Sequence, residues 1–292
     1  MFDIDLSYSS VKSAPRILYP LILKKLFKRN TGKDLNLFFP KTFNEKIQYL
    51  KLFDNKKIKT LLTDKIEAIK LIDGIVDKKH IKKIYGVYDN ISQINLSELH
   101  ESFYLKTNHG CKWQLKIDSK AYFLENFDEI NKKVNAWLKI NYAYANGLEL
   151  QYENIKPKIF TEEVIAHPDY MFPIDVEIFC FDGIPRLALV RAIKEEFCYG
   201  INIYSVEDGL LPYLFNKPSE FRKIDVVPLP NFYDEMLEIS KKITKGIKLA
   251  RVDFFYTKDN FYFGEVTFTP YSGYSTMNDE HFEKLISQWF HV

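Results

Sequence analysis

Residues 251–270 read RVDFFYTKDNFYFGEVTFTP, two runs of strand-forming residues on either side of a turn. Neighbouring residues of a strand point to opposite faces of the sheet, and directly opposed residues of an antiparallel pair share a face. If the turn is Lys258-Asp259-Asn260, Asp253 lies opposite Glu265 and Arg251 lies opposite Thr267. The polar face is then expected to carry Arg251, Asp253, Phe255, Phe263, Glu265 and Thr267, and the core face Val252, Phe254, Tyr256, Tyr262, Gly264, Val266 and Phe268.

Two acids on one face of a hairpin need a compensating cation. Opposed residues have Cβ atoms about 5 Å apart, and like charges at that distance destabilise a sheet. A magnesium ion held by one or two carboxylates and by phosphate oxygens would offset the charges of Asp253 and Glu265. Arg251 would equally do so as a cross-strand ion pair on a solvated face, and geometry alone leaves both alternatives open. A two-residue turn would instead place the acids on opposite faces.

The composition indicates a soluble, core-forming protein without a general affinity for nucleic acid. Of the 292 residues 46% are hydrophobic, and 41 basic side chains stand against 39 acidic ones. Three cysteines without CxxC spacing favour a reduced, cytoplasmic protein over a disulfide framework. The polar N-terminus lacks the apolar core of a signal peptide, and no stretch reaches the roughly 18 to 20 apolar residues that span a bilayer.

Hydrophobic periodicity predicts an α+β fold. Thr42 and Glu45 have the form of a capping box at the start of a helix. Apolar residues at helical spacing predict further helices at 60–71, 127–142, 233–245 and 279–290. Runs of β-branched and aromatic residues predict strands at 103–107, 113–117, 158–165, 175–181, 185–193 and 201–206. Asp182-Gly183, between two of these runs, is typical of a hairpin turn.

Residues 15–33 combine a short apolar block with five basic residues that follow it, Lys24, Lys25, Lys28, Arg29 and Lys33. One interpretation is association with an anionic membrane surface. The other, which we favour from the sequence, is a helix that packs on the domain and leaves its basic face in solvent. Both alternatives stay open.

Several stretches in order give the chain a resemblance to a known family. They are FNEKIQYLKL (43–52), Asp64-Lys65, FYLKTNHG (103–110), QYENIKPKIFTEE (151–163), DVEIFCFDGIPR (175–186), RVDFFY (251–256) and FGEVTFTPYSGY (263–274). With these stretches the chain resembles ATP-grasp proteins of the teichuronopeptide-synthesis (TupA-like) type. The resemblance implies two α+β lobes with antiparallel sheets that clasp ATP. It also implies a helical, basic segment at 1–40, a substrate-side lobe at 41–100, a small subdomain with the phosphate loop at 101–165, and a lobe with the metal site at 166–292.

The resemblance also implies roles for individual residues. Lys65 and Lys106 would reach the ATP phosphates, although Lys65 alone would read as a surface lysine on a helix. His109 and Gly110 would begin a mobile loop over the phosphates, with a turn-stabilising or exposed His109 as the alternative. The remaining assignments are Glu162 and Glu163 near adenine and ribose, Asp175 at the nucleotide, Asp253, Glu265 and Thr267 as magnesium ligands, and Arg251 on the transferred phosphate.

Two departures from the family pattern bear on activity. Cys111-Lys112-Trp113 stands where a Ser-Gly pair or a further glycine is usual, which predicts a stiffer loop that either weakens closure over ATP or brings Lys112 to the phosphates. Glu177 stands in place of a lysine and reverses a charge near the expected active centre. Substrate choice or activity therefore stays open.

The resemblance implies an ATP- and Mg²⁺-dependent carboxylate–amine ligase that acts through an acyl phosphate. Its partners would be a small amine or amino acid and a saccharide carboxylate, joined by an amide bond in bacterial surface polysaccharide (capsule) biosynthesis. A kinase that uses the same site is a close variant. The alternative is a degenerate ATP-grasp domain that binds nucleotide or saccharide as a scaffold. The expected location is the cytoplasm, with peripheral association at the inner membrane face through residues 15–33 left open.

Overall fold

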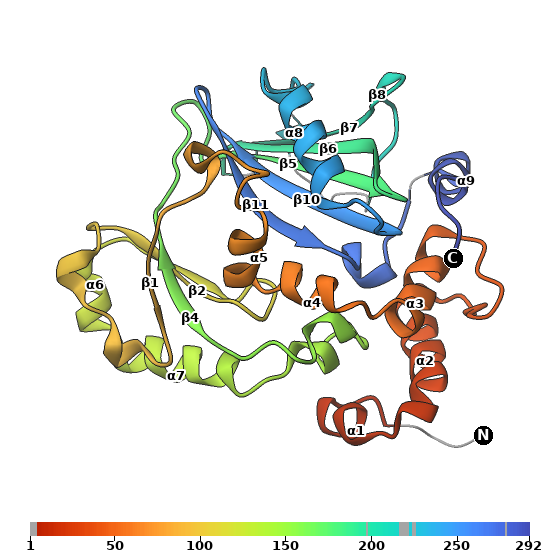
Figure 1. The fold of residues 1–292 in the computed structure, drawn as a ribbon, viewed down its shortest axis with the longest axis horizontal. Coiled ribbons are helices and arrows are strands. Elements are labelled where there is room, and N and C mark those ends of the chain that lie inside the picture. The colour runs from red at the N-terminus through yellow and green to blue at the C-terminus, as the bar shows by residue number, and fades with distance from the viewer. Residues whose placement is uncertain (1–4, 197, 216–221, 224–225, 278) are drawn as a thin grey trace.

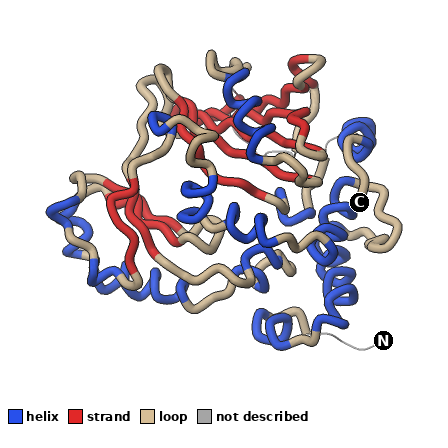
Figure 2. Tube along the Cα trace, viewed as in Figure 1, coloured by secondary structure: helices blue, strands red, loops and turns tan. Residues whose placement is uncertain are grey.

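Two antiparallel sheets form the framework of the molecule in a computed structural model, which describes residues 5–196, 198–215, 222–223, 226–277 and 279–292 (Figure 1). The smaller sheet has the strand order β1-β4-β2-β3 and the larger β11-β10-β5-β6-β7-β8, and β9 pairs in parallel with β7. The strands are Ile84–Tyr88 (β1), Phe103–Thr107 (β2), Gln114–Ile117 (β3), Ile159–Glu162 (β4), Ile174–Phe181 (β5), Ile184–Glu195 (β6), Cys198–Ser205 (β7), Gly209–Leu211 (β8), Arg222–Lys223 (β9), Leu249–Tyr256 (β10) and Phe261–Thr267 (β11). Helices surround both sheets in Figure 2, and the predicted α+β class is confirmed.

The helices cover the sheets and form the N-terminal segment. They are Tyr8–Ser13 (α1), Tyr19–Thr31 (α2), Phe43–Phe53 (α3), Lys57–Thr63 (α4), Lys65–Leu71 (α5), Lys120–Glu125 (α6), Phe127–Leu138 (α7), Tyr233–Ile243 (α8) and Glu280–Gln288 (α9), with short 3₁₀ turns between them. α6 and α7 pack on the small sheet. α8 packs on one face of the large sheet, and α3 and α9 share a core with its other face. Among the described residues no helix is both long and apolar enough to cross a bilayer.

Most expected elements are present within a few residues of their predicted ends. The capping box is confirmed: the Thr42 hydroxyl accepts from the Glu45 N–H over 3.3 Å, and the Glu45 carboxylate accepts from the Thr42 N–H over 3.0 Å. The helix expected at 127–142 ends earlier, at Leu138, and the strand expected at 158–165 ends at Glu162. The domain boundaries at 40, 100 and 165 stay predictions.

The helix predicted at 60–71 is wrong as a single element, because Asp64 divides it into α4 and α5. Asp64 has an extended backbone (φ −68°, ψ 112°), and its carboxylate accepts hydrogen bonds from two backbone N–H groups of α5 as an N-cap. The side-chain amide of Asn108 donates to the same carboxylate over 2.9 Å. The break therefore places Lys65 at the start of α5, beside the loop that follows β2.

The hairpin of β10 and β11 has the predicted pairing of its polar residues. Asp253 lies opposite Glu265, and Arg251 lies opposite Thr267. The predicted three-residue turn is wrong, however, because the loop spans four residues, 257–260. A β-bulge at Gly264 makes up the difference.

The bulge changes which aromatic residues face the core. Phe263 pairs with Phe254 and both are buried, whereas Tyr262 pairs with Phe255. The prediction that Phe263 lies on the polar face and Tyr262 on the core face is therefore wrong. Only glycine fits the bulge without strain, since a Cβ atom at Gly264 would lie 2.8 Å from the carbonyl oxygen of Asp253.

Gly264→Ala is expected to lower the free energy of unfolding by about 1–3 kcal/mol, because the added methyl group forces the backbone at Asp253 to move. Urea denaturation followed by circular dichroism measures this as a lower midpoint at unchanged slope. An alanine variant with the wild-type midpoint would show that the bulge tolerates a side chain.

Helix α3 holds the turn that follows β11, although the two are more than two hundred residues apart. Tyr271 (φ 53°, ψ 24°) and Ser272 (φ 53°, ψ 21°) both have left-handed backbones, which cost energy in residues other than glycine. Gln48 Nε2 donates to the carbonyl oxygens of Ser272 and Gly273 over 3.1 and 2.9 Å. Lys51 Nζ donates to the Ser272 carbonyl oxygen over 2.9 Å. These contacts hold the FNEKIQYLKL stretch of α3 against the TPYSGY stretch.

Lys51→Met is expected to lower the free energy of unfolding by about 1–3 kcal/mol, since it leaves the carbonyl oxygens of Gly147 and Ser272 without the ammonium donor that they share. Chemical denaturation measures the change. The matched control is Lys57→Met on the neighbouring helix, where the side chain is exposed and the expected change is within about 0.5 kcal/mol. Equal midpoints for the two variants would contradict the anchoring role.

Candidate active site

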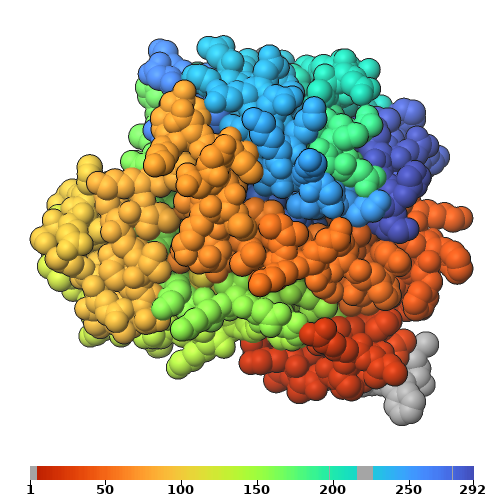
Figure 3. Space-filling model, viewed as in Figure 1, coloured from red at the N-terminus to blue at the C-terminus, as the bar shows by residue number. Residues whose placement is uncertain are grey.

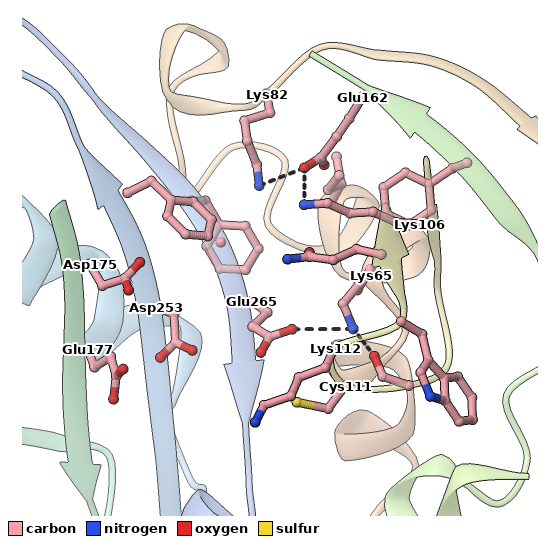
Figure 4. A pocket seen from close by; sticks show the side chains of 18 of the residues that line it. Lys65, Lys82, Lys106, Cys111, Lys112, Glu162, Asp175, Glu177, Asp253 and Glu265 are labelled. Carbon is pink, nitrogen blue, oxygen red and sulfur yellow. Dashed lines mark hydrogen bonds and ion pairs between the residues drawn. The ribbon is translucent and has the colours of Figure 1, made fainter. Parts of the chain in front are cut away.

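A cavity of about 240 Å³ between the two sheets collects residues from segments that are far apart in the sequence (Figure 4). One wall comes from α5, the small sheet and the loop after β2, and the other from β5, β6, β10 and β11. Eight of the predicted site residues line it: Lys65, Lys106, Gly110, Glu162, Asp175, Arg251, Asp253 and Glu265. Folding therefore brings together most of the residues that the sequence singled out.

The two acids of the hairpin have separate cationic partners. Arg251 donates to both carboxylate oxygens of Asp253, over 2.7 Å from Nε and 2.6 Å from Nη2. Glu265 lies 3.3 Å from the ammonium of Lys65. Burial raises the pKa of Asp253, and the carboxylates of Glu177 and Glu265 add to the rise against the pull of Arg251. For Glu265, burial alone would raise the pKa, but Lys65 and Arg251 outweigh it and the pKa is lowered.

The donor set at this cavity suits a magnesium ion that is shared with phosphate oxygens. Asp253 and Glu265 are opposed on one face of the hairpin and line the same cavity. Magnesium is commonly held by one or two carboxylates, with phosphates and water completing its octahedron. The described residues include no group of three or more histidine, cysteine or acidic side chains that could hold a metal alone. Asp253 and Glu265 thus supply two carboxylates of the kind that would hold a magnesium ion together with phosphate oxygens.

Lys65 and Lys106 approach the cavity from different elements. Lys65 Nζ also donates to the carbonyl oxygen of Gly110 over 2.6 Å, which ties α5 to the loop after β2. Lys106 Nζ on β2 donates to the carboxylate of Glu162 on β4. Burial, together with the nearby charge of Lys82, lowers the pKa of Lys106 to about 8. The two lysines thus lie at the cavity as the resemblance implies, each with one acid partner.

Lys82 is a third lysine at the cavity that the sequence interpretation missed. Its ammonium lies 3.1 Å from Glu162 Oε1, the oxygen that also accepts from Lys106 (Figure 4). The ammonium also lies 4.4 Å from the ring centroid of Phe255 on β10. Lys82 belongs to the run KKHIKK, residues 78–83, and such a run normally forms a solvated charged surface. The one signal that its side chain faces the cavity is its position just before a strand.

A second cavity of about 240 Å³ adjoins the first at Lys82, Lys106 and Glu162. Its lining adds Glu163 and apolar side chains, Ile165, Phe172, Pro173 and Ile193. The carboxylate of Glu163 accepts from the backbone N–H of Lys83 over 2.7 Å. Among the predicted residues, Glu163 thus lies beside this more apolar space rather than beside the hairpin acids.

Asp175 and Glu177 are held by arginines. Asp175 lies 3.6 Å from Arg191, and burial raises its pKa to about 6 against the pull of that arginine. Glu177 lies 2.9 Å from Arg191 and 3.2 Å from Arg251. The acid that replaces a lysine therefore anchors two arginines that line the cavity, so the charge reversal is compensated within the described chain.

The loop after β2 buries the side chain of His109, so the alternative of an exposed histidine is wrong, and the expected role of the backbone N–H groups at the phosphates stays a prediction. The His109 imidazole is buried, with Nε2 lying 3.2 Å from the carbonyl oxygen of Trp137, and burial lowers its pKa to about 4. A neutral, inward ring offers no charge to a phosphate, which leaves only the backbone of His109 for that role. Gly110 packs against the ring of Trp113, where a Cβ atom would lie 2.1 Å from it.

Cys111 and Lys112 line the cavity, and Lys112 has a left-handed backbone (φ 62°). Burial and the nearby carboxylate of Glu265 raise the pKa of the Cys111 thiol, so this cysteine is not an activated thiolate. Lys112 thus lies at the cavity beside Cys111, and its contact with phosphates stays a prediction.

A third cavity, of about 750 Å³, lies beyond Arg251 and Glu265 and shares both residues with the first. Thr267, predicted as a metal ligand, lines this third cavity, and its hydroxyl lies 3.5 Å from Arg251 Nη2. Five aromatic side chains line it as well: Trp113, Tyr142, Tyr152, Tyr271 and Tyr274. Polar groups at Asn146, Glu149, Thr269 and Ser272 line it too.

A family model described as TupA-like ATPgrasp matches residues 45–291. The chain belongs to the TupA-like ATP-grasp family. The family named from the sequence stretches is thus confirmed, and with it the ATP-grasp fold of two lobes that present antiparallel sheets to one another.

Solved structures with similar folds include two ligases. D-alanine–D-alanine ligase from Bacillus anthracis, in a complex with ATP, is 14% identical with a TM-score of 0.40 over 71% of this chain and 53% of that one. L-amino acid ligase from Bacillus licheniformis is 13% identical with a TM-score of 0.42 over 76% of this chain and 47% of that one. The TupA-like chain thus spans about half the length of these proteins, and likenesses this weak carry no information about its activity or substrate. No curated protein matches the sequence.

Proposed function

We propose that this chain is an ATP- and Mg²⁺-dependent carboxylate–amine ligase. The observation that carries the proposal is the convergence of Asp253, Glu265, Lys65, Lys106 and Arg251 on one cavity between the two sheets. Two opposed carboxylates, two lysines and an arginine are the groups that a metal–triphosphate requires. Membership of the TupA-like ATP-grasp family supports the same conclusion.

The three adjoining cavities suggest an order for the reactants. We place the adenine in the more apolar second cavity, beside Glu162 and Glu163. The phosphates then extend toward Lys106, Lys65 and the backbone of Gly110 in the first cavity. Asp253 and Glu265 would hold the magnesium ion, which when bound offsets the charge of the phosphate oxygens. The reacting carboxylate would enter from the third cavity, which meets the first at Arg251 and Glu265.

The proposed reaction has two steps. An oxygen of the substrate carboxylate attacks the γ-phosphorus of ATP, which breaks the bond to the β-phosphate oxygen and gives an acyl phosphate and ADP. The amine then attacks the acyl carbon, and inorganic phosphate leaves as the amide forms and the amine loses a proton. Arg251, whose guanidinium lies between Asp253 and Glu177, would stabilise the charge that develops on the transferred phosphoryl group. No protein nucleophile is needed, because positioning and charge neutralisation supply the catalysis.

The third cavity supports a saccharide as the carboxylate substrate. Aromatic rings in one cavity with amide, hydroxyl and carboxylate groups suit a sugar, which presents apolar ring faces and hydroxyl edges. A volume of about 750 Å³ gives room for more than a free amino acid. We therefore propose a sugar acid or amino sugar of a bacterial surface polysaccharide as one partner and a small amine or amino acid as the other.

The test is to incubate the protein with Mg-ATP and a panel of uronic acids and amines, and to measure ADP release. The ligase predicts release that needs both a carboxylate and an amine, and hydroxylamine should trap the acyl phosphate as a hydroxamate. A kinase would release ADP without the amine and give a product that hydroxylamine leaves intact. ATP binding without turnover for any pair would favour the scaffold alternative.

The affinity for ATP is expected to fall as pH rises above about 8. The Lys106 ammonium carries its charge below its pKa of about 8, so deprotonation removes one cation from the phosphate site. Isothermal titration of Mg-ATP between neutral and alkaline pH measures the effect. The variant Lys106→Arg stays charged throughout this range and should give a flatter profile. Parallel profiles for the two proteins would contradict the role of Lys106.

A further inference from the structure

The apolar block that suggested a membrane contact in the sequence is buried. Ile22, Leu23 and Leu26 of α2 pack into a core with Ala143 and Leu148. The block itself is therefore unavailable to a bilayer. A different set of apolar side chains in the same segment is exposed.

Four large apolar side chains in the N-terminal segment face solvent. Ile17 is 84% exposed, Leu21 49%, Phe38 60% and Phe39 77%. Ile17 lies in the 3₁₀ turn Arg16–Leu18 that precedes α2, Leu21 and Lys24 lie three residues apart on α2, and the ammonium of Lys24 lies 5.9 Å from the ring centroid of Phe38. The phenylalanine pair thus lies next to the exposed stripe of α2. In Figure 3 the N-terminal segment, in red, lies at the edge of the molecule.

The phenylalanine pair is presented by an anchored loop. Leu35 and Leu37 on the N-terminal side of the pair are buried. The carboxylate of Glu45 accepts hydrogen bonds from the backbone N–H groups of Asn36 and Lys41 over 3.1 and 2.9 Å. These bonds fix the backbone on both sides of Phe38 and Phe39. Their exposure therefore follows from the fold of the loop and not from an unanchored terminus.

The sequence of this segment is basic, in contrast to the rest of the chain, although Arg16 pairs with Glu153 over 2.7 Å, and Glu280 and Glu283 of α9 line a cavity with Lys33 and Lys41. Residues 15–41 contain seven basic residues and one acidic residue, whereas the whole chain has 41 basic and 39 acidic residues. Acids therefore outnumber bases in the remainder. Lys24, Lys28, Arg29 and Lys33 are exposed, and the one acid, Asp34, lies 3.1 Å from Lys28.

We propose that Ile17, Leu21, Phe38 and Phe39, with the lysines around them, form a docking surface for an anionic phospholipid bilayer. Exposed aromatic and aliphatic side chains insert at the level of the headgroups, and surrounding lysines bind the anionic lipid phosphates. Neither interaction holds a protein on a membrane alone, but the combination of apolar insertion and a basic patch does. The positive charge argues for an anionic lipid surface over a second copy of the chain, whose matching patch would repel it.

Co-sedimentation of the full chain with vesicles tests the proposal. Phosphatidylcholine vesicles that contain phosphatidylglycerol should bind the protein, and phosphatidylcholine vesicles alone should bind it about tenfold less or weaker. Added salt should release the protein. Failure to bind the anionic vesicles would overturn the proposal.

Matched variants identify the surface. Phe38→Ser/Phe39→Ser and Lys24→Gln/Lys28→Gln should each lower the fraction bound by about tenfold or more. Leu124→Ser, a 62% exposed leucine on α6, and Lys132→Gln/Lys139→Gln, exposed lysines at the other lobe, should bind as the wild type does. Circular dichroism should find all four variants folded. Equal binding by the phenylalanine variant and the wild type would overturn the proposal.

Sedimentation velocity tests whether the surface binds a second copy of the chain instead of a bilayer. If the wild type is a dimer and Phe38→Ser/Phe39→Ser is a monomer, the surface mediates self-association and the membrane proposal fails. The test does not depend on ligase activity, since ADP release plays no part in it.

Discussion

Glu265→Gln is expected to lower the rate of ADP formation by roughly a hundredfold to a thousandfold while leaving the fold intact. Glutamine keeps the shape of the side chain but removes the charge that lies 3.3 Å from Lys65 and opposite Asp253. The magnesium concentration at half-maximal rate should rise as well, because one of two carboxylate ligands is lost. Steady-state kinetics with the carboxylate and amine that give turnover, over a series of magnesium concentrations, measure both effects.

Asp259→Asn is the matched control for this variant. Asp259 is an exposed acid in the loop of the same hairpin, so its removal changes the net charge equally without touching the cavity. It should keep the wild-type rate and the wild-type magnesium dependence. If Glu265→Gln is as active as Asp259→Asn, Glu265 is not a magnesium ligand in the reaction.

Arg251→Met is expected to lower the free energy of unfolding by about 3–5 kcal/mol in addition to removing turnover, because it leaves the Asp253 carboxylate, which is 13% exposed, without its cation and leaves Glu177 with Arg191 alone. Arg251 donates to Asp253 through two nitrogens and lies 3.2 Å from Glu177. Chemical denaturation measures the stability, and ADP release under the same conditions measures turnover.

A second variant separates the two effects of Arg251. Arg251→Met/Asp253→Asn removes the stranded charge along with the arginine, so it should recover part of the lost stability and none of the activity. Arg186→Met is the surface control: Arg186 lies 3.3 Å from the exposed Glu207, and its loss should cost at most about 1 kcal/mol. If Arg251→Met is as stable as Arg186→Met, the buried ion pairs do not have the role given to them here.

The pairing of Asp253 with Glu265 could be predicted from the alternation of side chains along each strand. The four-residue loop and the bulge at Gly264 that produce this pairing could not. An odd-numbered turn and an even-numbered turn with a bulge place Asp253 opposite Glu265 equally well. Only the aromatic residues beyond the bulge differ between the two, and Phe263 and Tyr262 are nearly equivalent in apolar character. The signal that was present is Gly264, because glycine inside a strand often marks a bulge.

The sequence identified the site residues mainly through family motifs, and its misses have physical causes. Asp64 was not recognised as a helix break, although aspartate is a favoured N-cap, because the apolar periodicity continues across it. Lys82 was hidden in a charged run. The aromatic wall of the third cavity comes from segments around residues 113, 142, 152 and 271, and only the tertiary fold brings these together.

In the N-terminal segment the apolar residues that suggested a membrane contact are buried, whereas Phe38 and Phe39 nearby are exposed. The apolar block at 15–33 is amphipathic, and its apolar side faces the core because α2 has a partner there. The exposed phenylalanines lie beyond the predicted range, in a loop whose anchoring depends on the capping Glu45. Sequence periodicity describes helices and strands, and it carries no information on which way a loop turns its side chains.

The most direct test of the account is a crystal structure with magnesium and a non-hydrolysable ATP analogue. We expect a metal ion about 2.1 Å from carboxylate oxygens of Asp253 and Glu265 and from phosphate oxygens, with the phosphates also near Lys65 and Lys106. Arg251 would then have exchanged part of its contact with Asp253 for the terminal phosphate. A nucleotide whose phosphates lie away from the hairpin, or a metal ion that touches neither acid, would contradict it.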